Sequence, residues 1–257
     1  MISQIKSIIS DKTKTAHMPL YKTNPYKILF LDIETVSQVE DFGKLDTQWQ
    51  QLWDGKTQYQ RQEDSPADYY PKRAAVMAEF GKVVCISCGF LKDIDGQRTF
   101  RVRSFYGDDE KQLLEDFAEM LIKHFDRDYL LCAHNGKEFD FPYLSRRMIV
   151  NGVGLPNCLN TSGLKPWEVP HLDTMEMWKF GDWKSYTSIK LLAALFNIPT
   201  PKDDIDGSMV GHVYWKENDL ERIVTYCQKD AVTVARVFLK MEGLPTIKDE
   251  EIIINND

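Results

Sequence analysis

The segment ILFLDIETVS at residues 28–37 constrains the fold more than any other, because it places two acids inside an apolar run. The run is rich in large apolar residues and short enough to be a buried strand. Alternate side chains of a strand share a face, so Asp32 and Glu34 lie together and their apolar neighbours face the other way. Two adjacent like charges are costly to bury, and a bound cation resolves that cost. The alternative is a strand end with two hydrated acids.

Another acid lies in the segment AHNGKEFDFPYL at residues 133–144. Asp140 comes just before a predicted helix, where an acid that caps the helix N-terminus would be ordinary. Capping and metal binding are compatible because they need not use the same carboxylate oxygen. Asn135 and Phe139 flank this acid. Their structural alternatives are a loop residue with an unusual backbone angle and a core aromatic residue, respectively.

The third acidic segment is RIVTYCQKDAVTVARVFL at residues 222–239, which has helical spacing. Tyr226 and Asp230 are four residues apart and therefore share one face of the helix. An acid beside an apolar stripe points to a specific role more strongly than an acid on a hydrated face. The alternative is a Tyr–Asp hydrogen bond that only stabilises packing.

The order of the other segments predicts a mixed α/β sheet. Four further runs have strand length and strand composition, at residues 82–92, 98–107, 129–135 and 169–174. The sequence DIDG at 93–96 is a hairpin turn signal between the first two of them. Helices are expected near residues 71–80, 108–125, 141–150, 187–196 and 217–242. Three hairpin-linked strands followed by alternating helices and strands make a five-stranded mixed sheet flanked by helices.

The three acidic segments together resemble the three exonuclease motifs of DnaQ-like 3′–5′ exonucleases. The matching residues, in motif order, are Asp32, Glu34 and Thr35, then Asn135, Phe139 and Asp140, then Tyr226 and Asp230. The most similar version is the proofreading exonuclease domain of family B DNA polymerases. One branch of the family has a histidine five residues before the last acid, where this chain has Thr225, so it resembles the tyrosine (DEDDy) branch. The resemblance spans about residues 27–242 and implies a ribonuclease H-like fold.

The resemblance also implies the roles of the site residues. The catalytic set is Asp32, Glu34, Asp140, Tyr226 and Asp230, and its four acids are the metal ligands. Two divalent ions, Mg²⁺ or Mn²⁺, balance four negative charges and prefer such hard oxygen ligands. By resemblance Asp32 bridges both ions, while Tyr226 orients the attacking water. Thr35, Asn135 and Phe139 are the expected substrate contacts.

Composition and length bound these expectations. The chain of 257 residues has a composition ordinary for a globular protein. We expect an N-terminal arm over 1–25, a single domain over 26–243 with an insertion at 37–80, and a C-terminal tail over 244–257. No apolar run approaches the roughly 20 residues of a membrane span, and the N-terminus is too polar for a signal peptide. A cytoplasmic protein without a membrane partner is therefore expected.

The net charge of −7 argues against a protein that coats duplex nucleic acid, since such proteins are usually basic. The expected activity is that of a stand-alone metal-dependent 3′–5′ exonuclease on single-stranded DNA or 3′ ends, releasing nucleoside 5′-monophosphates. The alternatives are a ribonuclease that trims RNA 3′ ends and a catalytically silent nucleic-acid-binding protein of the same fold. A polymerase or repair partner is not identifiable from the sequence.

Several other residues are assigned structural roles. His134 is expected to stabilise a strand end rather than act as a base, and Asp173 to support the site without binding metal. Cys85 and Cys88 lack a second pair, so zinc binding is not expected. Aromatic residues of the insertion, Trp49, Trp53 and Tyr59, are expected to pack it rather than stack on bases. Lys190 and Lys202 could neutralise phosphates but are not included in the predicted site, because surface lysines are usually hydrated.

Overall fold

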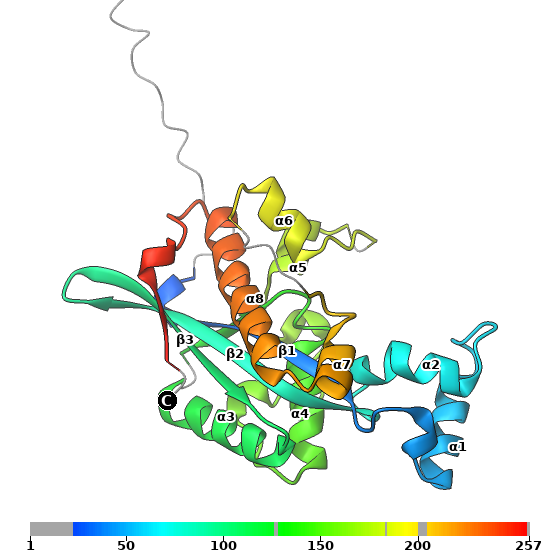
Figure 1. Cartoon of the computed structure of the whole chain (residues 1–257). Coiled ribbons are helices and arrows are strands. Elements are labelled where there is room, and N and C mark those ends of the chain that lie inside the picture. The colour runs from blue at the N-terminus through cyan, green and yellow to red at the C-terminus, as the bar shows by residue number, and fades with distance from the viewer. Residues whose placement is uncertain (1–22, 126–127, 183, 200–204, 256–257) are drawn as a thin grey trace, which may run out of the picture.

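The fold is described from a computed structural model over residues 23–125, 128–182, 184–199 and 205–255 (Figure 1). Most of the predicted N-terminal arm, and Lys202, lie outside the described residues. Within these ranges none of the helices is both long and apolar enough to cross a membrane.

The described residues form a six-stranded mixed sheet with the order β5-β4-β1-β2-β3-β6. The strands are β1 (Ile28–Ser37), β2 (Gly81–Ile94), β3 (Gln97–Tyr106), β4 (Leu130–Ala133), β5 (Leu172–Asp173) and β6 (Ile252–Ile254). β1 and β3 each run antiparallel to β2, and the other neighbours are parallel. The predicted mixed α/β class, with a mixed sheet flanked by helices, is confirmed. The expected count of five strands is wrong, because residues within the predicted C-terminal tail pair with β3 as β6.

The helices flank this sheet on both faces. They are α1 (Thr47–Thr57), α2 (Pro66–Arg73), α3 (Glu110–His124), α4 (Asp140–Val150), α5 (Thr174–Lys179), α6 (Ile189–Leu195), α7 (Val210–His212) and α8 (Leu220–Met241). Short 3₁₀ helices occupy Pro25–Lys27, Phe42–Lys44, Ala74–Val76, Asn157–Leu159, Pro166–Glu168 and Asp249–Glu251, and one turn of π-helix occupies Val213–Glu217. The helix predicted at 71–80 is wrong. Ser65 caps an earlier helix with Pro66 in its first turn, and that helix ends at Arg73.

The alternation of side chains along β1 divides the core into two layers. Ile28 and Phe30 pack with the apolar face of α8, and Leu29 and Leu31 pack on the opposite face with α3 and α4. Figure 1 shows α8 crossing in front of β1 and β2, with α3 and α4 on the other side of the sheet. The acids of β1 therefore lie on the α8 face.

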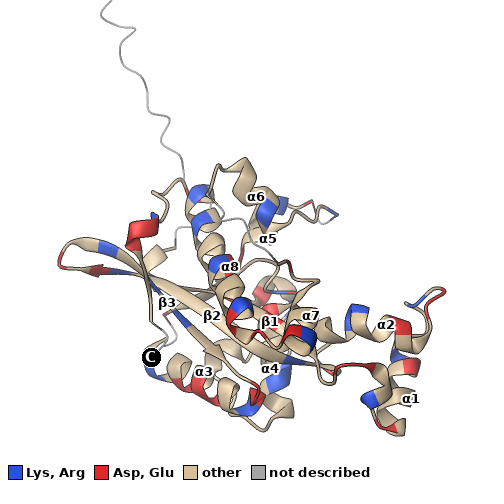
Figure 2. Ribbon diagram, viewed as in Figure 1, with Lys and Arg blue, Asp and Glu red and all other residues tan. Residues whose placement is uncertain are grey.

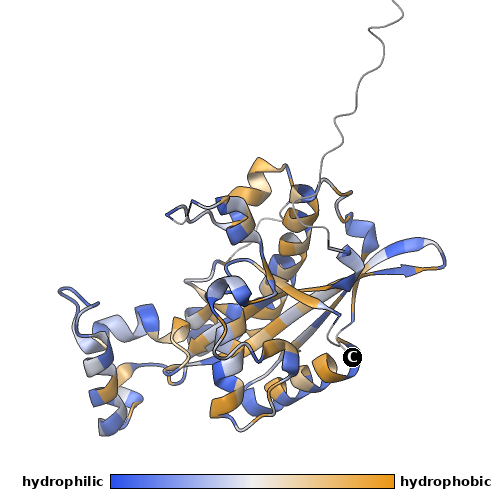
Figure 3. Ribbon diagram, turned by 180° about the vertical axis from the view of Figure 1, so that it is seen from behind, coloured by the Kyte–Doolittle hydropathy of each residue, from blue (hydrophilic) through white to orange (hydrophobic). Residues whose placement is uncertain are grey.

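The predicted hairpin turn between β2 and β3 is present. Ile94 pairs with Gln97, and the two residues between them, Asp95 and Gly96, have φ angles of 53° and 79°. Positive φ at both central residues is the geometry that Asp-Gly favours in two-residue hairpins. The tip of this hairpin is coloured mainly hydrophilic in Figure 3.

The insertion between β1 and β2 carries α1 and α2 and extends away from the sheet (Figure 1). It has a small core of its own, in which fully buried Trp53 and Tyr70 pack with Phe80. The Trp53 indole N–H donates to the Pro66 carbonyl at 2.8 Å. Packing therefore accounts for Trp53, as predicted, while Tyr59 is 91% exposed at the surface of the insertion.

A buried ion pair fastens α3 to α4 beneath the sheet. The Arg147 guanidinium donates to both Glu110 carboxylate oxygens, at 2.8 and 2.5 Å. Glu110 also accepts the Val83 backbone N–H at 2.8 Å, and Arg147 donates to the Ala78 carbonyl at 2.9 Å. Both charges are thereby fully engaged, and the pair joins two helices to β2 and to the segment before it.

Replacing Glu110 by alanine should destabilise the fold strongly, because it leaves the Arg147 charge buried without its partner. The expected loss is about 3–5 kcal/mol in the free energy of unfolding, measured by urea titration. Lys123→Ala removes an exposed i,i+4 pair with Glu119 and should change the stability by no more than about 0.5 kcal/mol. Equal effects of the two substitutions would contradict the role assigned to the buried pair.

Candidate active site

The site lies where β1 continues beyond β4. The parallel pairing of these strands ends at Phe30 with Cys132, and β4 ends one residue later at Ala133. The edge of β1 beyond this point is therefore open to other groups. Asp140 approaches this edge: its carboxylate lies close to the Ile33 backbone, which favours the charged form of the acid. Asp140 is the first residue of α4, and the N-cap position expected for it belongs to Phe139, whose side chain makes no capping hydrogen bond.

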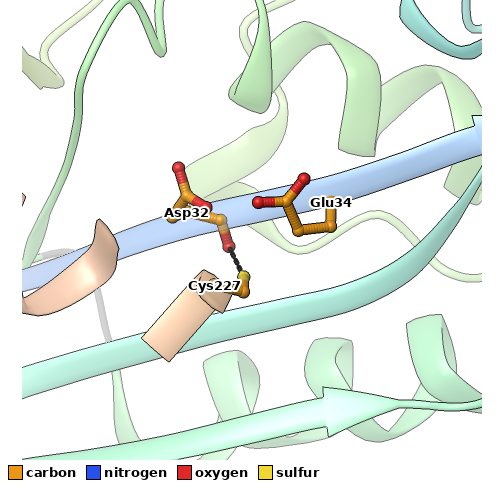
Figure 4. A group of neighbouring side chains, drawn as sticks. All are labelled: Asp32, Glu34 and Cys227. Atoms are coloured by element: carbon orange, nitrogen blue, oxygen red, sulfur yellow. Dashed lines mark hydrogen bonds between the residues drawn. The ribbon is translucent and has the colours of Figure 1, made fainter. Parts of the chain in front are cut away.

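Asp32 and Glu34 project from the same face of β1, as their spacing predicted (Figure 4). The helix that covers this face, α8, places Cys227 beside them, and the Cys227 thiol donates to the Asp32 carbonyl at 3.3 Å. One ligand atom from each of the three residues lies within 4.8 Å of the other two. Figure 2 shows acidic residues gathered where β1 passes beneath α8.

The carboxylates raise one another's pKa. Burial raises the pKa of Asp32 well above its ordinary value, and the charges of Glu34, Asp230 and Asp140 add to that shift. Burial likewise raises the pKa of Glu34, with further contributions from the charges of Asp230 and Asp140. Burial also raises the pKa of Asp140, to about 7. Three separate segments thus bring four acids into one electrostatically coupled cluster.

Asp230 and Tyr226 form the α8 side of the site. The Tyr226 hydroxyl hydrogen-bonds the Asp230 carboxylate one helical turn away. Burial and the nearby charges of Asp230 and Glu34 raise the pKa of the Tyr226 phenol far above its ordinary value. Tyr226 is therefore a neutral phenol at any physiological pH. The hydrogen bond proposed as a purely structural alternative is present, and it lies inside the acidic cluster.

The donor set fits a hard divalent cation. The Asp32 Oδ2 atom is buried, and among the described residues it has no hydrogen-bond partner. Such an orphaned carboxylate oxygen is costly unless something positive binds it. Asp32, Glu34, Asp140 and Asp230 supply oxygen ligands, which suit Mg²⁺ or Mn²⁺. Cys227 does not fit that role, because burial raises the pKa of its thiol and its proton is already donated to the Asp32 carbonyl.

The turn after β4 carries the predicted substrate contact Asn135. Its φ of 64° is left-handed, the backbone angle considered for it in the sequence. Asp173 holds this turn by accepting the backbone N–H groups of Asn135 and Lys137 at 2.9 and 3.1 Å. It also accepts the Met175 N–H at 2.9 Å and so caps α5. Asp173 therefore supports the site through the backbone, the supporting role that was expected.

The other two predicted contacts differ in accessibility. Phe139 is half-buried, with its ring centroid 5.2 Å from that of Tyr143, so one part of the ring remains available. Thr35 is buried, and its hydroxyl hydrogen-bonds the Tyr143 hydroxyl, which donates to the Ala75 carbonyl at 2.8 Å. The Thr35 side chain is therefore little exposed, and a substrate contact by Thr35 stays a prediction.

His134 is occupied on both ring nitrogens. Nδ1 lies 2.8 Å from the Thr174 hydroxyl and Nε2 lies 2.9 Å from the Thr187 carbonyl. Burial lowers the pKa of the ring. The expectation of a structural role is therefore consistent with its contacts, which tie the end of β4 to the segment that leads into α6.

Lys190 on α6 is the residue that sequence reasoning passed over. Its ammonium lies 5.4 Å from the centroid of the Tyr226 ring, and its charge lowers the pKa of Glu34. Nothing in the spacing distinguishes it from a surface lysine. A usable signal would have been the Ser188 cap, which starts α6 two residues before it and so sets its orientation.

Comparison with known protein families identifies the family of the chain. A family model described as a predicted 3′–5′ exonuclease related to the exonuclease domain of PolB matches residues 75–252, more than half of the chain. That range includes Asp140, Tyr226 and Asp230 but not the acids of β1. A search of curated proteins found no match.

Among solved structures, the chain is similar to the family B DNA polymerase from the hyperthermophilic archaeon Pyrobaculum calidifontis. The sequence identity is 19% and the TM-score is 0.49. The match covers 84% of this chain and 25% of the polymerase, so the chain spans about a quarter of that protein's length.

The clustered acids predict that metal-free protein is destabilised as the pH rises. Their pKa values are raised in the folded state, so folding binds protons. This contribution to stability is complete below the ordinary values of 3.8 and 4.5, and it is lost as the pH rises through the raised values, which is about 7 for Asp140. Asp32→Asn removes one buried charge and should stabilise the metal-free protein at pH 8 by about 1–3 kcal/mol. Melting temperatures in EDTA at pH 5 and pH 8 measure this.

Asp93→Asn, on the exposed hairpin, is the matched control and should have little effect at either pH. Mn²⁺ should raise the melting temperature of the wild type at pH 8 and not that of Asp32→Asn. A wild type whose metal-free stability is the same at both pH values would contradict the coupled cluster.

Proposed function

The chain belongs to the family of predicted 3′–5′ exonucleases related to the exonuclease domain of PolB, and on that premise we propose that it is a stand-alone metal-dependent 3′–5′ exonuclease. Its substrate is single-stranded DNA or a 3′ end, and its product is a nucleoside 5′-monophosphate. The observation that carries the proposal is the gathering of four carboxylates from three distant segments around an unpartnered Asp32 oxygen. Burying four like charges destabilises the folded protein, and bound cations would offset that cost and supply the chemistry.

Divalent ions would be held by Asp32, Glu34, Asp140 and Asp230, with Mg²⁺ or Mn²⁺ as the ions that suit these oxygens. When bound, such ions activate water and stabilise the charge that develops on the attacking and leaving oxygens of a phosphodiester. The acidic net charge is compatible with this function, since the site grips one strand end and needs no broad basic groove.

Tyr226 acts as an orienting group in this proposal. Its phenol remains neutral, so it cannot be the base that removes a proton from water. Its proton is directed to Asp230, which leaves an oxygen lone pair free to accept a hydrogen bond from the attacking water. The nearby Lys190 ammonium places a positive charge beside the same ring. It would offset the charge of a phosphate oxygen entering the site.

The terminal nucleotide is placed by the residues at the end of β4. The half-buried ring of Phe139 offers a face on which a base can stack without sequence readout. Asn135, fixed in its left-handed conformation by Asp173, presents its amide at the same turn. Both groups act before the chemical step, by holding the 3′ end against the acidic cluster.

The direct test uses 5′-labelled single-stranded DNA and matching RNA with Mg²⁺ or Mn²⁺. The wild type should shorten the DNA from its 3′ end as a ladder, and Asp230→Ala should lose more than the roughly 10–100-fold typical of outer metal partners. Glu119→Ala, an exposed acid on α3, is the matched control and should retain full activity. No shortening of either strand by folded wild type would favour a silent binding protein, and shortening of RNA alone would favour the ribonuclease.

Tyr226→Phe isolates the orienting hydroxyl, because it keeps the ring in its packed position. The expected result is a fall in kcat of roughly 10–100-fold with KM changed less than twofold, since the lost hydrogen bond acts on the attacking water. Steady-state kinetics on single-stranded DNA measure both values. A raised KM with unchanged kcat would instead assign Tyr226 to substrate binding.

A further inference from the structure

Three aromatic side chains are left exposed near the β5 edge of the sheet. Trp167 precedes β5, Phe180 follows α5 and Tyr186 precedes α6, and their side chains are 75%, 74% and 65% exposed. Single exposed apolar residues are common, but a cluster of large rings usually marks a binding surface. These rings contribute little to the core, so packing does not explain them.

The rings border a groove that reaches the turn carrying Asn135, beside the candidate active site. Trp167 and Phe180 line a cavity of about 1120 Å³ together with Asn135 and Asp173. Tyr186 lies at its rim, because its hydroxyl donates to Glu138, another lining residue, at 3.0 Å. Pockets for small ligands usually measure about 300–1,000 Å³, so this groove has room for more than one nucleotide. It leads from the turn that carries Asn135 out to Trp167.

The charges along the groove are largely cancelled. Lys179 lies 4.0 Å from Glu138, and Lys137 pairs with Glu176 at 2.7 Å. Cations also lie over two of the rings: the Lys165 ammonium is 5.3 Å from the Trp167 centroid, and Lys179 is 4.4 Å from the Tyr186 centroid. Ring faces rather than net charge are therefore what the groove offers a ligand. That is the chemistry by which single strands are held through their bases.

Phe180 provides a separate indication. It ends α5 in the left-handed region, with φ 44° and ψ 37°. A bulky residue is strained there, and glycine is the usual choice at a helix end. Because the ring is exposed, burial does not offset this strain. Strain retained without a packing gain is characteristic of a functional position.

We propose that Trp167, Phe180 and Tyr186 form a stacking track for the bases that lie 5′ of the terminal nucleotide of a single strand. This inference rests on the proposed function, since it assigns the track to a strand whose 3′ end occupies the acidic site. Stacking would make the affinity depend on strand length and only weakly on salt. It would also be indifferent to base identity, because every base has a face to stack.

The test compares wild type with Trp167→Ala, Phe180→Gly and Tyr186→Ala, singly and combined. Binding of a fluorescent 12-residue oligothymidylate is measured by anisotropy in Ca²⁺, and hydrolysis of the same strand and of a thymidine dinucleotide is measured in Mg²⁺. Each substitution should weaken binding of the 12-mer at least about fivefold, as expected for the loss of one stacked base. The KM for the 12-mer should rise in parallel, while hydrolysis of the dinucleotide changes less than twofold.

Two variants serve as controls, one for protein stability and one for the loss of any exposed ring. Phe180→Gly relieves the left-handed strain, so its melting temperature should equal or exceed that of the wild type while its binding weakens. Tyr59→Ala removes an equally exposed ring from the insertion and should bind as the wild type does. Unchanged binding of the 12-mer by the triple variant would overturn the track.

The binding measurement does not depend on turnover. A wild type that binds the 12-mer through the three rings but hydrolyses neither oligonucleotide would contradict the proposed function and support the track. A wild type that hydrolyses both with the same KM as the triple variant would support the nuclease and overturn the track.

Discussion

The approach of the Asp140 carboxylate to the backbone of Ile33, at the unpaired edge of β1, is the constraint on which the site depends. It is possible because β4 stops at Ala133 while β1 continues, so that a backbone group in the middle of a sheet has no strand partner on one side. A helix that starts there can bring its first residue to the acids of β1. The site is therefore a product of unequal strand length rather than of a flexible loop.

The gathered carboxylates oppose folding, and the rest of the molecule offsets that cost. The two apolar layers on either side of β1 supply most of the burial, and the pair between Glu110 and Arg147 fastens the helices beneath the sheet. Local conflict of this kind is expected where function, and not stability, has selected the residues. The same reasoning applies to Phe180 in its left-handed conformation.

Residue spacing predicted the parts of the fold that are governed by local geometry. The shared face of Asp32 and Glu34 and the helical turn between Tyr226 and Asp230 follow from periodicity, and the Asp-Gly hairpin follows from its turn residues. The predictions that failed concern parts of the fold that depend on contacts between residues far apart in the sequence. The strand β6 exists only because β3 has a free edge, and no local pattern can show that edge.

The other features that the sequence did not predict also depend on contacts between residues distant in the chain. The Thr35 hydroxyl interacts with Tyr143, which lies far along the chain. Lys190 lies beside the Tyr226 ring because of the orientation of α6. Trp167 and Phe180 also meet in one groove only after folding. Sequence reasoning could name the acids because a motif keeps them at fixed local spacings. It could not assign the neighbours that shape access to them.

The two ends of the insertion at 37–80 are held close together by the pairing of β1 with β2. β1 and β2 pair up to Ser37 and Gly81, and the Gln38 N–H donates to the Phe80 carbonyl at 2.9 Å, so the two ends of the insertion are clasped together. A segment that leaves and returns at one point, with its own buried Trp53, is joined to the sheet much as a long hairpin loop would be. The entropy of closing such a loop changes slowly with its length. The insertion is thus an exchangeable module, which evolution or an engineer can lengthen, shorten or replace while the register of the acidic strand stays the same.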